Sequence, residues 1–325
     1  MLSVYVSRGH ALECSAVPPG TPLPADAVWI DLVSPTHDED RLVEDLLGIA
    51  VPTREEMQEI EVSSRLYMEN GARYMTATLM CQSDSEAPKT TAVTFILAGR
   101  RLVTVRYDEP RPFAIVTSKL ARTCPAAVNG ETVMMEILDA VIDRAADILE
   151  RASAEVDIVS RQIFEPAKRR PDHTRIYNHI MRTIGRKGDL NSKVRESLVS
   201  IGRLVLFLAN EADGLKWPKE MRAQLKVMQR DVASLTDHAS YLSNKIIFLL
   251  DALIGFVSIE QNNIIKIFSV ASVALLPPTL IASIYGMNFK FMPEVEWAFG
   301  YPMAIGMMLL SALLPFLYFK WRGWL

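Results

Sequence analysis

Polar residues at regular spacing occur within and just before a long uncharged stretch near the C-terminus of this 325-residue chain. Steps of four and three residues from Asp251 follow one face of a helix with a repeat close to 3.5 residues. The line, made mostly of small, hydroxylated and amide residues, consists of Asp251, Gly255, Ser258, Asn262, Ile265, Ser269, Ser272, Leu276, Thr279 and Ser283. It predicts the lining of an aqueous pathway, with Asp251 at the mouth and Leu276 as an apolar constriction. Close packing between helices favours the same small residues, so the spacing leaves both interpretations open.

Carboxylates further upstream are candidate ligands for a hard cation such as Mg²⁺, which prefers oxygen. Asp231 and Asp237 lie on a predicted helix, where clustered unpaired acids would repel one another without a cation. These two residues are therefore candidate ligands for a divalent cation. The acidic run Asp38, Glu39 and Asp40 is more typical of a solvated helix start, with a regulatory cation site as the alternative.

Patterns typical of an enzyme do not occur in the sequence. His173 and His179 are six residues apart, which does not place them on one helix face as metal ligands. The chain has no Cys-x-x-Cys pair, His-Glu-x-x-His motif, nucleophile elbow or Gly-rich phosphate loop. We therefore predict neither an enzyme nor an organic cofactor. The widely separated Cys14, Cys81 and Cys124 indicate a reducing compartment.

Two uncharged segments are long enough to cross a membrane. Residues 267–287 form a run of 21 without charge, and residues 297–319 form a run of 23, whereas about 20 apolar residues suffice for a transmembrane helix. Buried helices of a soluble protein are the alternative, but they seldom remain uncharged over such lengths. Basic residues flank the outer ends of the pair, and the connection between them carries Glu294 and Glu296. The positive-inside rule therefore predicts that both termini face the cytoplasm.

The N-terminal part of the chain mixes strand and helix signals. Short apolar or alternating segments typical of strands occur at residues 3–6, 28–33, 73–80, 91–97 and 102–106. Short acidic helices are expected at residues 36–47 and 53–60, with Thr36 and Thr53 as N-caps. Asn70-Gly71 is a hairpin signal.

After Gly130 the apolar spacing changes to the helical period. Helices are predicted over residues 131–163 and 174–209, the second with a break near Gly185 as an alternative. A third helix follows Pro218, because Pro suits a first helical turn, and no further Pro occurs before Pro277. At 1.5 Å per residue, residues 219–276 would form a stalk about 87 Å long that continues into the first span.

The predicted organisation is an α+β cytosolic domain followed by long stalk helices and two C-terminal transmembrane helices. Its parts are residues 1–125 (cytosolic domain), 126–265 (stalk region), 266–287 (first span), 288–296 (periplasmic loop), 297–319 (second span) and 320–325 (cytosolic tail). Residues 1–170 carry 26 acidic and 18 basic residues, and residues 171–325 carry 12 and 17. This balance does not indicate a nucleic-acid-binding protein. The first residues alternate like a strand and lack the features of a secretory signal.

The end of the first span carries the triplet Gly286-Met287-Asn288, followed by Met292-Pro293-Glu294. In the context of the segments IEQNNIIKIFSV and LLPPTLIASIYGMNFKFMPE and the ending YFKWRGWL, this triplet resembles the signature of the CorA magnesium/cobalt transporters, proteobacterial branch. The N-terminal VWIDLV is a weaker similarity. One departure is Val295, where the family more often has Leu, and it leaves Glu294 in place.

The resemblance implies a funnel-shaped homopentamer in the bacterial inner membrane, with membrane lipid and identical subunits as its partners. It implies a ring of Gly286, Met287 and Asn288 at the outer mouth of a pore. By position, Asn288, Thr279 and Leu276 would line the pore, and Asp251 would ring its inner end. It also implies Mg²⁺, with Co²⁺ and Ni²⁺, as the transported ion. It further implies closure by intracellular Mg²⁺ bound between subunits, and we expect Asp231 and Asp237 to help bind this regulatory ion.

The chemistry of Mg²⁺ agrees with these expectations. The ion loses its water reluctantly, so neutral amides and carbonyls can hold its hydrated form. Two charges that cross a potential of 100 mV gain about 4.6 kcal/mol, so the membrane potential would be a sufficient driving force. One alternative is a zinc-selective or proton-coupled transporter of the same superfamily. The other, a membrane-anchored sensor without transport, agrees less well with the polar line.

Overall fold

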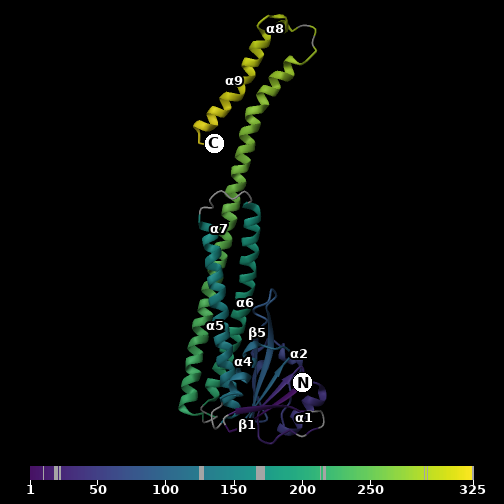
Figure 1. Ribbon diagram of the computed structural model, residues 1–325, viewed down its shortest axis with the longest axis vertical. Helices are drawn as coiled ribbons and strands as arrows, with labels where there is room; N and C mark the ends of the chain where they lie inside the picture. The colour runs from purple at the N-terminus through teal and green to yellow at the C-terminus, as the bar shows by residue number, and fades with distance from the viewer. Residues whose placement is uncertain are drawn as a thin grey trace. The chain divides into compact units, whose positions relative to one another are not determined.

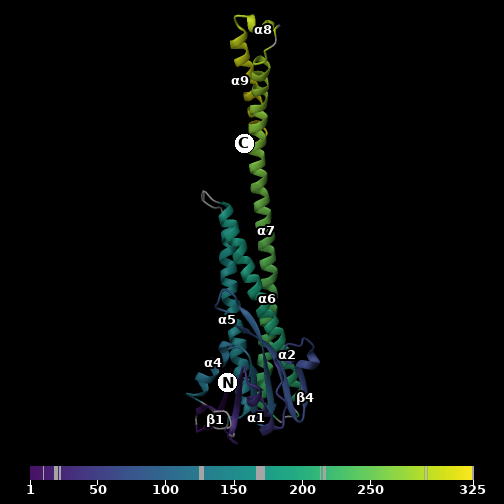
Figure 2. The same ribbon diagram turned by 90° about the vertical axis from the view of Figure 1, so that its right-hand side faces the viewer.

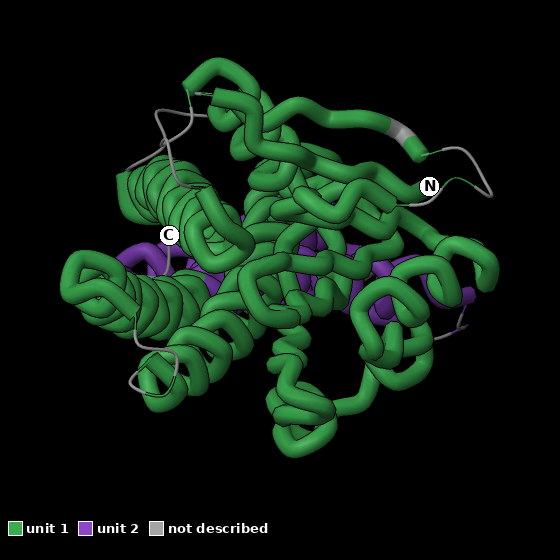
Figure 3. Tube along the Cα trace, turned by 90° about the horizontal axis from the view of Figure 1, so that it is seen from below, with its two compact units in different colours: residues 1–249 green, residues 250–325 purple. Residues whose placement is uncertain are grey.

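A computed structural model describes residues 1–9, 11–17, 21, 23–123, 128–165, 173–212, 214, 217–288, 290 and 292–323. Cys124 and the last two residues of the predicted tail lie outside the described residues. The chain divides into two compact units, residues 1–249 and residues 250–325, which Figure 3 colours separately.

A seven-stranded sheet forms the centre of the first unit (Figure 1). Its strands are β1 (Leu2–Arg8), β2 (Ala11–Ala16), β3 (Ala27–Val33), β4 (Leu66–Glu69), β5 (Ala72–Cys81), β6 (Lys89–Ala98) and β7 (Arg101–Arg106). They lie in the order β2-β1-β3-β7-β6-β5-β4. The β3–β7 pair is parallel and the other neighbouring pairs are antiparallel.

The structure contains all five strands expected from the sequence and two more, β2 and β4. These two are the edge strands of the sheet, and their exposed side chains interrupt the apolar pattern of a buried strand. The hairpin predicted at Asn70-Gly71 is confirmed, because it joins β4 to β5. Asn70 and Gly71 have φ of 50° and 80°, the left-handed pair that a tight type I′ turn requires.

Three short helices follow β3, of which the first two contribute buried residues to the core on one face of the sheet. They are α1 (His37–Leu47), α2 (Arg54–Met57) and α3 (Val62–Arg65). Val43 of α1 and Met57 of α2 join the apolar side chains of β1, β3, β5 and β7 in one buried cluster. The predicted N-caps Thr36 and Thr53 are confirmed, and each forms a capping box with a glutamate three residues later.

Three helices that follow β7 in the sequence pack on the strands: α4 (Arg111–Leu120), α5 (Gly130–Phe164) and α6 (His173–Glu211). The Phe113 ring of α4 lies 6.2 Å from the Trp29 ring and 6.3 Å from the Phe95 ring, measured between centroids. Helix α4 was not among the elements predicted from the sequence, although Phe113, Val116 and Leu120 form a buried face at helical spacing. The alternative break near Gly185 does not occur, because α6 is continuous through that residue.

A buried polar network joins the two parallel strands. Asp31 of β3 is 2% exposed and accepts a hydrogen bond of 2.6 Å from the Thr104 hydroxyl of β7. Its other carboxylate oxygen lies 2.8 Å from the Arg106 guanidinium, which also lies over the Phe113 ring. Trp29 Nε1 donates to Thr104 Oγ1 over 2.9 Å. A charge at this depth is tolerated because it is paired and hydrogen-bonded.

Helix α7 (Lys219–Tyr285) begins in the first unit and ends in the second. Within the first unit it lies alongside α5 and α6 (Figures 1 and 2). Asn191 of α6 donates to the Ala239 carbonyl over 2.9 Å, and Lys245 pairs with Asp157 of α5. The second unit also contains α8 (Pro293–Glu296) and α9 (Gly300–Trp321).

Candidate functional site

Among the residues that the structure describes, two helices are long and apolar enough to cross a membrane, judged by length and composition: α7 and α9. Their most apolar windows are only 6% buried. The core helix of a soluble protein would bury such a window against its own chain. These surfaces therefore favour contact with lipid or with other copies of the chain.

The polar line predicted from the sequence lies on α7, and every one of its members is exposed. Leu276 is 66% exposed and Ile265 is 53% exposed, although both are large apolar residues. Met287 and Asn288, which follow the helix, are exposed as well. The chain therefore places these candidate residues on or just beyond one helix and leaves them available to other molecules.

Two hydroxyl groups of the line donate hydrogen bonds within the helix. Thr279 Oγ1 donates to the Leu275 carbonyl over 2.8 Å, and Ser258 Oγ donates to the Ile254 carbonyl over 2.9 Å. A hydroxyl that donates back to the preceding turn keeps its oxygen lone pairs as acceptors. Such acceptors suit the water protons of a hydrated cation.

Two consecutive prolines, Pro277 and Pro278, lie inside α7. Proline has no N–H, so the carbonyls of Val273 and Ala274 lack the donor that an ordinary helix would supply. A polar group at membrane depth needs a partner from protein or water. These carbonyls add acceptors to the part of α7 that also carries Ser272.

The end of α7 lies directly before the Gly286-Met287-Asn288 triplet. The Gly286 amide donates to the Ala282 carbonyl over 2.9 Å, and the Met287 amide donates to the Ile284 carbonyl over 3.3 Å. A helix C-terminus carries a partial negative charge, which favours a cation near the triplet. Backbone groups thus close the last turn, and the Asn288 side chain forms no hydrogen bond within the part of the chain that the structure describes.

In the connection between the spans, the backbone at Gly300 lies close to the backbone at Glu294. This contact was not predicted from the sequence. A Cβ atom on Gly300 would lie 1.9 Å from the Glu294 carbonyl oxygen, so a larger residue would displace the backbone. The Gly300 amide also donates to the Trp297 carbonyl over 2.9 Å. Glycine at this position therefore lets α8, which carries Glu294, contact the start of α9.

The two candidate regulatory residues, Asp231 and Asp237, are exposed on the first-unit part of α7. The described residues contain no group of three or more His, Cys, Asp or Glu side chains placed to hold a metal ion. Asp231 lies close enough to Asp139 of α5 to contribute to a raised carboxyl pKa there, after burial and other neighbouring charges. A site at these aspartates would need ligands from another subunit.

The sequence of this chain is similar to those of known transport proteins. A family model described as CorA-like Mg²⁺ transporter protein matches residues 24–321. The magnesium transport protein CorA of Escherichia coli strain K12 is 36% identical over 325 residues, covering all of both chains. The chain belongs to the CorA family.

Two further matches extend the comparison. The CorA protein of Salmonella typhimurium is 36% identical over 300 residues, 92% of each chain. The complete structure of the CorA magnesium transporter from Methanocaldococcus jannaschii superposes with a TM-score of 0.76 at 16% identity and covers 100% of this chain and 99% of that one. CorA membership confirms the resemblance drawn from the triplet, and the structural match shows the shared fold of soluble domain, long helices and apolar C-terminal helices.

Proposed function

We propose that this CorA-family protein is a channel for hydrated Mg²⁺, formed by several copies around an axis lined by α7. The observation that carries the proposal is the exposed polar line of α7, which leads to Gly286-Met287-Asn288. The relatives named above are magnesium transport proteins, and this chain has oxygen-bearing side chains along the line. Asn288, Thr279 and Asp251 would present oxygen atoms to the ion's water shell, and Leu276 would form the constriction.

Association of several copies follows from the geometry of a pore, because two spans cannot enclose one. The first-unit part of α7 supports this step, since it exposes apolar residues in a seven-residue frame. Val227, Tyr241 and Phe248 are 52%, 58% and 60% exposed, and Ser234 occupies the position between the first two. A seven-residue apolar repeat is typical of helices that pack around each other. A homopentamer is the assembly that we propose.

The proposed pathway holds Mg²⁺ without dehydrating it. Mg²⁺ keeps its waters and tolerates few deviations from octahedral geometry, so amide and carbonyl oxygens at Asn288 would bind the hydrated ion weakly enough for release. Glu294 in the adjacent loop would attract cations to the mouth. Co²⁺ and Ni²⁺ would follow the same route.

Entry would be driven by the membrane potential, with both termini in the cytoplasm and the protein in the inner membrane. At 100 mV a divalent ion gains about 4.6 kcal/mol on entering a negative interior. Intracellular Mg²⁺ bound between subunits, with Asp231 and Asp237 among its ligands, would favour the closed state. This arrangement would link influx to the cytoplasmic concentration of the ion.

A flux assay in liposomes tests the proposal. The purified full-length protein should admit Mg²⁺, Co²⁺ and Ni²⁺ in proportion to the applied potential, and a pH gradient should have no effect. Flux limited to Zn²⁺, or flux that requires a proton gradient, would favour a zinc or proton-coupled transporter. Absence of any divalent flux from correctly assembled protein would refute the channel.

A further inference from the structure

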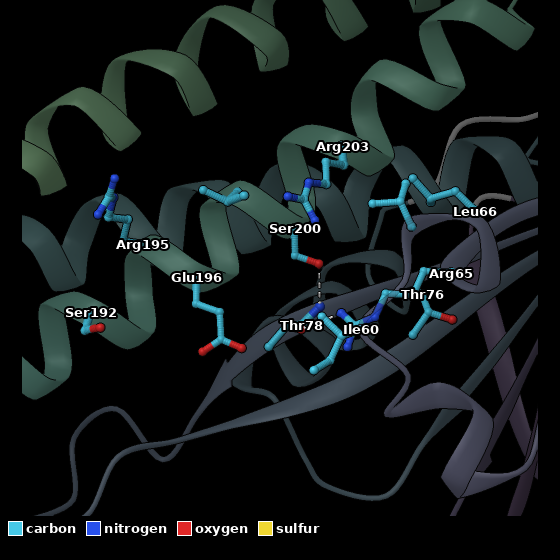
Figure 4. Close-up of a pocket in the computed structure, with 12 residues that line it drawn as sticks. Ile60, Arg65, Leu66, Thr76, Thr78, Ser192, Arg195, Glu196, Ser200 and Arg203 are labelled. Carbon is cyan, nitrogen blue, oxygen red and sulfur yellow. Dashed lines mark hydrogen bonds between the residues drawn. The ribbon is translucent and has the colours of Figure 1, made fainter.

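A cavity of about 490 Å³ lies between the sheet and α6 in the first unit, and its lining includes no residue of the candidate pathway. Arg65 and Thr78 border it from α3 and β5, while Arg195, Glu196 and Arg203 border it from α6. Figure 4 shows Arg203 and Ser200 facing the strand that carries Thr78, with Arg195 further along the helix. Residues distant in sequence thus form one concave surface.

The charge around this cavity is unbalanced. Three guanidinium groups and one carboxylate border it. None of these four side chains forms an ion pair with another residue that the structure describes. A second cavity of about 440 Å³ on the other side of α6 differs, because its charges are paired: Lys187 with Glu155 at 2.5 Å and Arg151 with Asp84 at 2.8 Å.

Arg65 is held rigidly at the back of the cavity. Its Nε donates to the Glu59 carbonyl, and a terminal nitrogen donates to Thr78 Oγ1 over 3.0 Å. Burial lowers the pKa of the guanidinium, the negative charge of Glu196 opposes this, and the positive charge of Arg203 adds to it. Arginine remains protonated under such conditions, so two cations face one cavity with little compensation.

Ser200 completes the polar lining. Its Oγ accepts a 2.9 Å hydrogen bond from the Thr78 amide, shown dashed in Figure 4. The hydroxyl proton has no acceptor within the described part of the chain and is therefore available to an anionic ligand. The geometry offers hydroxyl and guanidinium donors together, which is the donor set that recognises phosphate oxygens.

We propose that this cavity binds a small phosphorylated organic molecule of the nucleotide type. The phosphate would lie between Arg65, Arg203 and Ser200, and the exposed side chain of Arg195 would turn toward it. Exposed apolar side chains at the rim would cover the organic part: Ile60, Val62 and Val199 are 86%, 45% and 37% exposed. The volume falls in the usual range of about 300–1,000 Å³ for small-molecule sites, which is more than an inorganic phosphate needs.

An adjoining cavity of about 220 Å³ extends the site. It shares Arg65, Thr78 and Glu196 with the first cavity and adds Arg54 and Tyr107. The Arg54 guanidinium lies over the Tyr107 ring, 5.2 Å from its centroid. A ligand with more than one phosphate could place the second one there. Binding at this site is independent of ion transport, so either proposal can fail without the other.

Equilibrium binding of ADP, adenosine and inorganic phosphate to the full-length protein in detergent tests the site, with EDTA present to remove Mg²⁺. ADP should bind saturably, phosphate more weakly and adenosine not detectably. The double variant Arg195→Gln/Arg203→Gln should weaken ADP binding about tenfold or more, because it removes two guanidinium groups that form charge-assisted hydrogen bonds with phosphate. Both side chains are exposed, so the variant should fold normally.

Two matched variants separate a specific site from general charge attraction. Arg186→Gln removes the same charge from the same helix at the paired cavity and should leave ADP affinity unchanged. Glu196→Gln removes the single carboxylate and should increase affinity. The proposal is overturned if ADP shows no saturable binding, if adenosine binds equally well, or if Arg186→Gln weakens binding as much as the double variant. If an acidic segment of a second copy occupied the cavity instead, ADP would show no saturable binding.

Discussion

Side-chain oxygen atoms on and just beyond α7 are the groups that a hydrated cation would meet. Thr279 and Ser258 direct their protons into the helix and keep lone pairs for water, as a passage for hydrated ions requires. Asn288 follows the last turn, which backbone amides already close. Its carbonyl oxygen is therefore free for a ligand in the described structure, and a capping role is not needed to explain it.

Asn288→Ala should reduce Mg²⁺ uptake to background, because it removes the oxygen that meets the ion's water shell. Asn288→Asp should slow release, since a ring of carboxylates would hold divalent ions too tightly. Uptake by cells or liposomes measures both effects, and mass measurement in detergent confirms that the variants assemble. Wild-type uptake by an assembled Asn288→Ala protein would refute the role at the mouth.

Leu276→Ser should raise the resting leak of Mg²⁺ severalfold without loss of selectivity. A ring of large apolar side chains disfavours water and ions, and Leu276 is 66% exposed and so available to form one. Liposome leak at high internal Mg²⁺ is the appropriate measurement. Leak and flux that both match wild type would place the constriction elsewhere, with Ile265 or Phe268 as the next candidates.

At the scale of elements, different contacts stabilise the sheet and the long helices. The sheet is joined at its parallel pair by the Asp31 network, and the first-unit part of α7 is held by α5 and α6. Removal of one partner of a buried charge pair lowers the free energy of unfolding strongly, because the other charge is then left buried and uncompensated.

Asp31→Ala should therefore destabilise the soluble unit by about 3–5 kcal/mol, since it leaves Arg106 without its carboxylate. Thermal unfolding of the full-length protein, followed by circular dichroism, measures the change. Glu13→Ala on the edge strand β2 is the control, because its ion pair with Arg8 is exposed and such pairs contribute about 0–1 kcal/mol. Equal effects of the two substitutions would contradict the structural role of Asp31.

Substitution of both Asp231 and Asp237 by Ala should weaken the inhibition of transport by cytoplasmic Mg²⁺. Both carboxylates are exposed on α7, and a shared Mg²⁺ would bring oxygen ligands from two subunits together. Protection from proteolysis by Mg²⁺ gives a direct readout of the same binding. Unchanged protection in the double variant would exclude these two residues as ligands.

At the scale of the whole molecule, the proposed channel requires association of several copies. The single chain leaves its most apolar windows 6% buried and exposes Tyr241 and Phe248 in the same seven-residue frame as the polar line. Apolar surfaces of this kind are unfavourable in water and favour contact with lipid or with other copies of the chain.

Tyr241→Glu should shift the assembly toward smaller oligomers, because it places a charge among the exposed apolar residues of α7 that we propose to pack between copies. Mass measurement in mild detergent should give a symmetric oligomer for wild type, consistent with five chains. Ile115→Glu on α4 is the matched control, since Ile115 is also exposed, at 46%, but lies on another helix. A stable monomer that still transports would refute the oligomeric pore.

The sequence by itself was sufficient for the features that depend on neighbouring residues. Helical spacing predicted α5, α6 and α7, uncharged runs predicted the spans, and Thr36 and Thr53 identified two helix starts. The triplet at residues 286–288 identified the family. These features follow from local hydrogen bonding and from transfer of apolar segments out of water, both of which can be evaluated along a short stretch of chain.

Only the tertiary structure decided which distant residues meet. The parallel pairing of β3 with β7, the network of Asp31 with Thr104, and the arginines around the α6 cavity join segments far apart in the chain. Arg65, Arg195 and Arg203 look like ordinary solvated charges in the sequence, and only their common cavity distinguishes them. Such contacts depend on loop closure and on packing of the whole core, which no local pattern encodes.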